Sequence, residues 1–301
     1  MLPGMSHELK RRWPCIAILP FLFSSAAAQA SAGVCQPPAV SNELFVGIVA
    51  QDKATLEPPP GSTEEEHRIV DVLLKPASGR WSIGFGHRYT ILNVEDITPQ
   101  TNAHLHTAYF PLHWIDNSDR KSFRASFAPV LSASSNIMGD PEEYRGDTLQ
   151  LLFALSWRRN YAEWTLRYGI CGDHRFGEYT IYPSVGVEWQ PHPDVTLDVG
   201  FPHIRLTYRF NDRFSSGIGV SPDGNEWHVA DRAMTQESLL VYEGYAIDWE
   251  FRWEALPDLS ISAAIGAPLD SRYELTLLNG ERITVGADPV LRVSAGLRWK
   301  F

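Results

Sequence analysis

The segment VLRVSAGLRWKF (290–301) alternates strictly between two kinds of side chain. Its odd-numbered residues, from Leu291 to Phe301, are all apolar, whereas its even-numbered residues, from Arg292 to Lys300, are basic or small. A period of two places successive side chains on opposite faces of a β-strand, whereas a helix repeats about every 3.6 residues. The segment is therefore predicted to be a strand with one apolar face up to residue 301.

The same period recurs from about residue 80 onward. It is clear in RWSIGFGHRYTIL (80–92), SFRASFAPVLS (122–132) and TLQLLFALSWR (148–158). In a soluble β-sandwich the faces opposite the core are exposed to water, so they should be rich in Lys, Glu, Thr and Asp. Here those faces carry mostly Gly, Ser, Ala and Arg, and Trp81 and Trp299 lie near strand ends. Such aromatic residues favour a membrane–water boundary, so the pattern favours a membrane protein over the sandwich.

A closed barrel is the way for strands to satisfy their backbone hydrogen bonds in lipid. The connections alternate between short ones such as NDR (211–213) and long ones such as NIMGDPEEYRGD (136–147). Bacterial barrels have short periplasmic turns and longer outer loops. We predict an all-β fold, a transmembrane antiparallel up-and-down β-barrel of about twelve strands with both termini in the periplasm. The last strand should close the barrel by pairing with a strand near 80–92.

The N-terminal region reads as an export signal. A basic stretch (10–12) precedes the apolar run CIAILPFLF (15–23) and the small residues SSAAAQA (24–30). That order is typical of a cleavable signal peptide, which we assign to residues 1–30. We expect the exported chain to be localised in the bacterial outer membrane.

The remaining chain divides into two predicted parts. Residues 31–77 are rich in turn signals such as LEPPPGSTEEE (56–66) and are predicted to be an irregular extension, either periplasmic or inserted in the lumen. Residues 78–301 are predicted to form the barrel. Only Cys35 and Cys171 remain after signal cleavage, and a disulfide between them is permitted outside the cytosol, although the sequence leaves their pairing open.

Residues 78–301 resemble bacterial outer-membrane β-barrels as a class. The final alternating segment, with Leu297, Trp299 and Phe301, resembles the signal read by the barrel-assembly machinery. GFGHRYTILN (84–93) and GFPHIRLTYRFNDRFSSGIGV (200–220) are similar to stretches in a family of uncharacterised outer-membrane barrel proteins. The resemblance implies outer-membrane lipid and lipopolysaccharide as partners, with the assembly machinery and periplasmic chaperones during biogenesis. It implies no activity and no site residues.

The charge balance excludes one class of partner and directs attention to the lumen. Acidic residues outnumber basic ones by 36 to 26, so a nucleic-acid partner is disfavoured. Arg facing lipid costs about 2–4 kcal/mol at the midplane of such barrels, so charged residues on the polar faces should point inward. The predicted lumen-lining residues are Arg88, Arg124, Arg167, Arg205, Arg209, Asp248, Glu250, Arg252, Arg292 and Arg298. Two roles stay open, a network of ion pairs that fills the interior and a path for anionic solutes.

Three histidines are the nearest candidates for chemistry. Barrel enzymes that modify lipids resemble one another in a Ser–His pair near the outer rim, but their His-x-Ser-type segment is missing here, and His87 falls on an apolar face. His104 and His106 share one strand face and could hold a metal ion with a third ligand, yet none occurs at a convincing spacing. We therefore predict no catalytic residues, no metal site and no cofactor.

The function predicted from these features is a porin-like passive channel for small hydrophilic solutes, with a weak preference for anions. The first alternative is a structural or surface-binding barrel with a blocked lumen, whose outer loops meet lipopolysaccharide or a partner. A lipid-modifying outer-membrane enzyme is the third.

Overall fold

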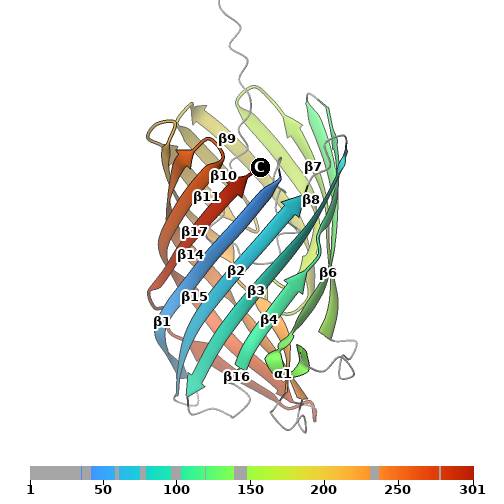
Figure 1. The fold of residues 1–301 in the computed structure, drawn as a ribbon, viewed down its shortest axis with the longest axis vertical. Helices are drawn as coiled ribbons and strands as arrows, with labels where there is room; N and C mark the ends of the chain where they lie inside the picture. Colours follow the sequence, from blue (N-terminus) through green and yellow to red (C-terminus); the bar gives the residue numbers. More distant parts are fainter. Residues whose placement is uncertain are drawn as a thin grey trace, which may run out of the picture.

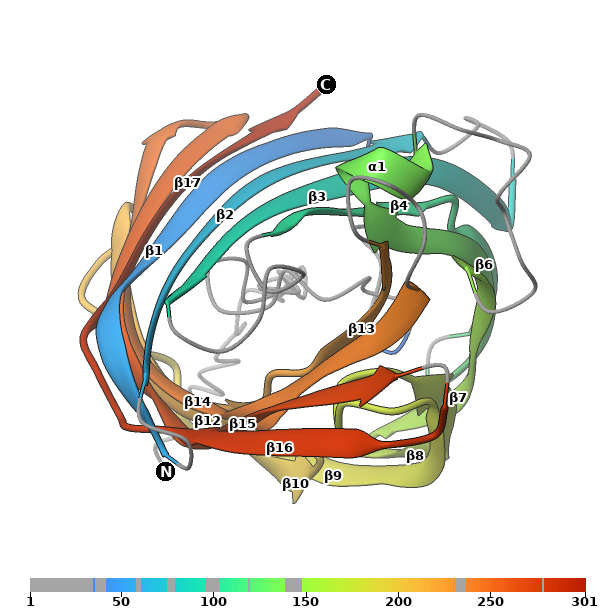
Figure 2. The same cartoon turned by 90° about the horizontal axis from the view of Figure 1, so that it is seen from below.

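The computed structural model describes residue 35 and residues 42–57, 61–74, 79–95, 103–118, 120–138, 148–230, 237–277 and 279–301. Almost all of these residues are strand, and the one α-helix among them is the four-residue α1 (Ser135–Met138). The strands form a single sheet that closes on itself, seen from the side in Figure 1 and along its axis in Figure 2. The predicted all-β barrel is confirmed.

The described residues contain seventeen strand segments. They are β1 (Glu43–Glu57), β2 (Gly61–Leu74), β3 (Trp81–Glu95), β4 (Ala103–Tyr109), β5 (Leu112–Asn117), β6 (Lys121–Ser134), β7 (Leu149–Asn160), β8 (Trp164–Asp173), β9 (Thr180–His192), β10 (Val195–Phe201), β11 (Ile204–Arg209), β12 (Phe214–Pro222), β13 (Asn225–Ala230), β14 (Glu237–Leu256), β15 (Leu259–Leu277), β16 (Arg282–Ala287) and β17 (Arg292–Lys300). We call the end where β1 begins and β17 stops the terminal end, which is uppermost in Figure 1. The opposite end, where α1 lies, is the loop end.

In three places, two segments pair with successive parts of the same neighbouring strand, so together they form one strand of the barrel wall. Both β4 and β5 pair with β6, both β12 and β13 pair with β14, and both β16 and β17 pair with β15. The seventeen segments therefore make fourteen continuous barrel strands, which we call staves. Fourteen is an even number, as in bacterial barrels, and differs from the predicted count of about twelve. The two extra staves are β1 and β2.

The assignment of an irregular extension to residues 31–77 is wrong for most of that region, because β1 and β2 are full barrel strands paired with each other. The prolines that suggested irregular structure fall between Glu57 and Gly61, in the connection and not in the strands. In β2 the alternation is masked because both faces carry acidic residues. Glu64 is exposed on the outer face, while Glu65 is buried on the inner face. Residues 1–34, which include the predicted signal peptide, lie outside the described residues.

The alternating segment at residues 290–301 closes the barrel, but with a different partner from the one predicted. β17 pairs with β1, placing Leu297 opposite Val46 and Trp299 opposite Leu44, and not with the strand at 80–92. The Phe301 N–H continues this ladder by donating to the Asn42 carbonyl at 3.1 Å. Strand pairing up to the last residue explains why the alternation does not fade. The role of Leu297, Trp299 and Phe301 as an assembly signal stays a prediction.

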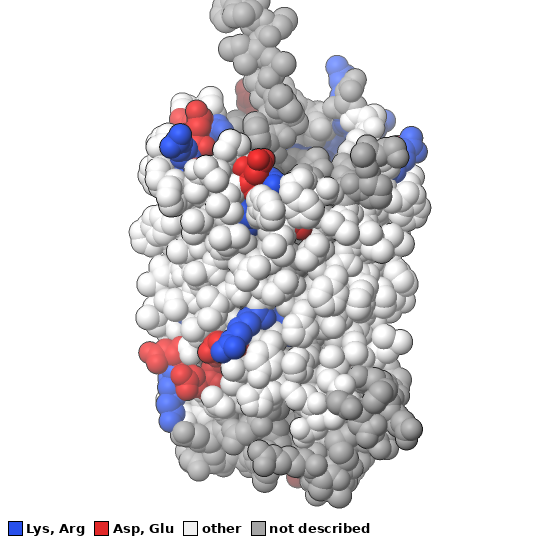
Figure 3. Space-filling model, in the orientation of Figure 1, with Lys and Arg blue, Asp and Glu red and all other residues white. Residues whose placement is uncertain are grey.

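The outer wall is apolar. Large hydrophobic side chains such as Trp81, Ile83 and Leu149 are exposed on it, with half or more of their surface accessible. Figure 3 shows a band of uncharged side chains across one face, with charged residues above and below it. Such a surface is unfavourable in water and suits a hydrocarbon layer bordered by headgroups. Separately, no helix of the described residues is long and apolar enough to cross a membrane.

The cross-section of the barrel narrows toward the loop end. Toward the loop end, β8 and β9 extend only to the level where Gly172 of β8 lies opposite Phe153 of β7. β10 and β11 contain only seven and six residues. β12 stops at Pro222, and β13 then turns inward and reaches β6, with His228 beside Ala133. Figure 2 shows β13 running inside the ring of the other strands. At the loop end the wall therefore passes from β6 directly to β13, without the staves in between.

Candidate functional site

The charged residues predicted to line the lumen all lie on the inward face of their strands. Arg292, for example, is 5% exposed, whereas its neighbours Leu291 and Val293 are about half exposed on the outer wall. Arg209 lies at the terminal rim, where its Nη2 donates to the Pro193 carbonyl at 2.5 Å. The alternation that assigns these residues to the inner face therefore holds from strand to strand.

In the half of the lumen nearer the terminal end, arginines pair with carboxylates. Arg158 lies 3.4 Å from Glu188, and Arg298 lies 3.3 Å from Glu43. Arg167 pairs with Asp198. Between a seventh and a third of the surface of each of these side chains is exposed, so this half of the lumen is accessible to water. We call it the vestibule.

Glycines on intermediate strands allow some of these pairs to form. Arg205 of β11 reaches across β12 to Glu250 of β14, and a Cβ on Gly217 of β12 would lie 3.2 Å from the Arg205 guanidinium. Arg252 adds a second bond to Glu250, at 2.7 Å. In the same way Arg167 passes over Gly186, whose added Cβ would lie 3.3 Å from Arg167 Nη2. The inner faces are rich in Gly and Arg because the long side chain needs the bare backbone beside it.

A ring of buried ionisable side chains borders the vestibule near mid-height. Arg292 pairs with Asp223, and His67 Nε2 lies 3.0 Å from Glu65 Oε1. Arg88 is also buried and forms no ion pair within the described part of the chain; its Nε has no hydrogen-bond partner there. Burying charge is costly unless it is paired, so this ring depends on close packing of the two signs. Asp248, also buried, belongs to the same ring.

Beyond the ring, toward the loop end, the lumen is filled by apolar side chains. Trp227 is 1% exposed, and its indole N–H donates to Thr107 Oγ1 at 3.1 Å. We call the buried set the apolar gate; its members are Leu56, Leu92, Leu105, Trp227, Val229, Leu240, Tyr242, Tyr273, Leu275 and Val285. Trp227 and Val229 enter it because β13 turns into the lumen. The charged lining predicted from the sequence therefore stops at mid-height.

A disulfide fixes Cys35 to the lumen wall. Cys171 is buried on the inner face of β8 and is bonded to Cys35, 136 residues earlier in the chain. The Cα atoms are 5.8 Å apart, and Arg124 Nη2 donates to the Cys35 carbonyl at 3.4 Å. Of the two locations predicted for the region before the barrel, the lumen is thus correct at Cys35, and the pairing left open by the sequence is present.

Comparisons with known proteins add only a general likeness in architecture. No family model matches the chain, and no curated protein matches it in sequence. Among solved structures, an outer membrane channel from Pseudomonas putida F1 aligns over 91% of this chain and 100% of its own, at 10% identity and a TM-score of 0.48. The KdgM porin (85% and 99% covered, 7% identity, TM-score 0.38) and the Pseudomonas putida toluene transporter TodX (87% and 89%, 9%, 0.38) align less closely.

The location follows from the molecule itself. A closed antiparallel barrel with an apolar outer band and aromatic residues at its borders is the form in which proteins span bacterial outer membranes. This chain is an outer-membrane β-barrel. Its function is argued below from its own residues.

The three histidines considered for chemistry lie together on the outer wall near the loop end. His87 Nε2 is 3.1 Å from His106 Nδ1, and His106 Nε2 is 2.8 Å from Ser135 Oγ, a contact that sequence analysis missed because Ser135 follows β6. His104 Nδ1 lies 2.5 Å from the Tyr89 hydroxyl. Ser135 Oγ also donates to the His104 carbonyl at 3.1 Å.

This outer cluster is better explained as hydrogen bonding of the wall than as a catalytic or metal site. A hydroxyl has one proton, so while Ser135 donates to the His104 carbonyl it cannot give that proton to His106. The described residues bring no further histidine, cysteine or carboxylate to His87 and His106 at metal-binding distances.

Proposed function

We propose that the protein is a passive outer-membrane channel with a charged vestibule at the terminal end and an apolar gate at the loop end. The observation that carries this proposal is the change of lining along one lumen, from Arg–carboxylate pairs to ten buried apolar side chains. A structural barrel has no need of a wet interior, whereas a channel needs one on the side where solutes leave. The terminal end is assigned to the periplasm because most of its connections are short, as in other bacterial barrels.

The solute class proposed is small molecules with an apolar body. A hydrated ion would lose its water in the apolar gate and gain few polar partners there, so the gate opposes ions and sugars. A small apolar molecule would exchange contacts with Trp227, Tyr242 and Tyr273 for contacts of the same kind. This proposal differs from the small hydrophilic solutes predicted from the sequence.

Passage of anionic solutes is the second candidate, and the arginines of the vestibule favour it. Against it, the partly exposed arginines are each paired with a carboxylate, so little net positive charge faces the lumen; these residues are Arg158, Arg167, Arg205, Arg252 and Arg298. A barrel with a permanently blocked lumen is the remaining alternative, favoured by the close packing of the gate.

Two permeability assays on the same protein separate these functions. In proteoliposomes, arabinose should cause no swelling above that of empty vesicles, because the gate excludes sugars. In intact cells, expression should accelerate entry of the apolar dye N-phenyl-1-naphthylamine. Rapid arabinose entry would contradict the gate and favour the hydrophilic path. If neither arabinose nor the dye enters, the barrel with a permanently blocked lumen is the function that remains.

A further inference from the structure

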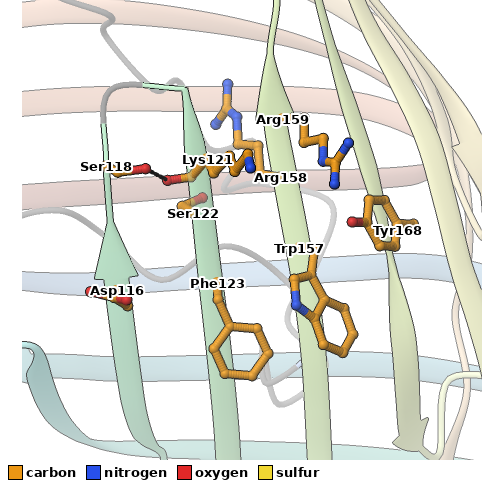
Figure 4. A pocket seen from close by; sticks show the side chains of 9 residues that line it. All are labelled: Asp116, Ser118, Lys121, Ser122, Phe123, Trp157, Arg158, Arg159 and Tyr168. Atoms are coloured by element: carbon orange, nitrogen blue, oxygen red, sulfur yellow. Dashed lines mark hydrogen bonds between the residues drawn. The ribbon is translucent and has the colours of Figure 1, made fainter.

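A pocket on the outer wall at the terminal end has features of a lipid-headgroup site. Its volume is about 280 Å³, and it is formed by the ends of β5, β6, β7 and β8. Figure 4 shows Lys121 and Arg159 near the turn, with the rings of Phe123 and Trp157 further along the same two strands and Tyr168 on the next. The lining also includes Arg158, which pairs with Glu188 in the vestibule, so the pocket lies at the rim beside the lumen; it is separate from the histidine cluster.

Two exposed cations line the mouth of this pocket. Lys121 of β6 and Arg159 of β7 are direct partners in the strand register, and both side chains are exposed. Like charges opposite each other destabilise a strand pair. Neither forms an ion pair within the described residues, whereas Asp116, the acidic residue of the lining, lies 3.3 Å from Arg80. The arrangement leaves two positive charges that an anion could share.

Aromatic rings lie below the cations, toward the middle of the wall. Phe123 and Trp157 are partners two residues along from Lys121 and Arg159, with ring centroids 4.9 Å apart. Trp157 also stacks nearly parallel to Tyr168, at 5.8 Å. We call these three rings the aromatic ladder. Trp157 keeps 40% of its surface exposed, so the aromatic ladder presents an open apolar face. Charge at the rim and apolar surface beneath it match the two parts of a lipid molecule.

The backbone holds the two cations in place. The turn before Lys121 is closed by two hydrogen bonds to its carbonyl, from Ser118 N–H at 2.8 Å and Ser118 Oγ at 3.0 Å. On the next strand the Asn160 N–H donates to the Arg120 carbonyl at 3.0 Å. The spacing between Lys121 and Arg159 is therefore set by the fold before any ligand arrives.

We infer that this pocket binds the phosphate of an anionic phospholipid in the leaflet at the terminal end. Lys121 and Arg159 would share the phosphate oxygens, and an acyl chain would lie over Phe123, Trp157 and Tyr168. Cations near a membrane surface each attract anionic lipid, and two held at one point make that attraction local. The inference is independent of the proposed transport function, since Lys121, Arg159 and the aromatic rings face outward and none belongs to the apolar gate.

The test is the amount of dioleoylphosphatidylglycerol that stays bound to the purified full-length barrel, measured by native mass spectrometry. The double variant Lys121→Gln, Arg159→Gln removes both charges while keeping both side chains polar and flexible, and it should lower retention about tenfold. Arg213→Gln, which removes an exposed cation of the same end outside the pocket, should leave it unchanged. Heat-modifiable migration on gels confirms that each variant is folded.

The outcomes separate the ligands. Equal retention in the double variant and in the protein itself would overturn the site. Displacement by water-soluble glycerol phosphate would show that the headgroup alone is recognised and would overturn the role of the aromatic ladder. Preferential retention of lipid A would overturn the assignment to phospholipid and place the terminal end in the outer leaflet.

Discussion

The two halves of the lumen connect the strands of the barrel in different ways. In the vestibule, neighbouring and next-nearest staves are joined by side chains that cross the inner face, such as Arg205 to Glu250 over Gly217. In the apolar gate, the staves are joined by packing around Trp227, which β13 carries into the interior. The first solution leaves part of each charged side chain exposed, whereas the second buries its side chains. The difference shows that the position of one inward-turned strand decides where this barrel closes.

The largest expected effect is that of emptying the gate. Trp227→Ala removes the largest buried side chain of the cluster and should lower the free energy of unfolding by about 3–5 kcal/mol. Trp81→Ala, which removes an exposed Trp from the outer wall, should cost much less. Urea unfolding in lipid vesicles measures both. Equal losses would mean that the gate is not a packed core.

Breaking an ion pair in the buried ring should lower the free energy of unfolding almost as much. Arg292→Met leaves Asp223 buried without its partner, which should cost about 3–5 kcal/mol in the same unfolding assay. Arg298→Met breaks the pair with Glu43 at the terminal rim, where about a seventh of each side chain is exposed, and should cost less, because water can reach the carboxylate left behind. A similar loss in the two variants would contradict the distinction between the buried ring and the wet vestibule.

The glycines of the vestibule provide a finer test. Gly217→Ala places a Cβ 3.1 Å from the Leu206 carbonyl and 3.2 Å from the Arg205 guanidinium, so it should displace the pair with Glu250 and cost about 1–3 kcal/mol. Gly286→Ala is the matched control, because its nearest neighbour would be 3.4 Å away. If both alanines prove equally harmless, Gly217 is not needed for the crossing arginine.

The smallest effect should come from releasing the N-terminal tether. Cys35→Ser with Cys171→Ser releases residue 35 from the vestibule wall, yet ion conductance should not change while the gate is closed. In a Trp227→Ala background the same pair of substitutions should raise conductance, because the vestibule then becomes limiting. A rise in the otherwise unaltered protein would place the main barrier at the tether.

Sequence alone predicts the class of fold and the inner face of the strands well, because a period of two is a local property and Arg292 between Leu291 and Val293 needs no tertiary information. It fails at β2, where acidic residues on both faces hide the alternation. It also cannot predict the gate, since Trp227 and Val229 look like any strand residues until β13 is known to leave the wall. The bridge from Arg205 to Glu250 escapes it for the same reason, because its ends are 45 residues apart.

Single-channel conductance in planar bilayers tests the central claim most directly, by comparing the protein with Trp227→Ala under the same salt gradient. The protein itself should conduct ions poorly, and the variant should conduct severalfold more, because the apolar gate and not the charged vestibule is the barrier. Large conductance that Trp227→Ala leaves unchanged would contradict this account.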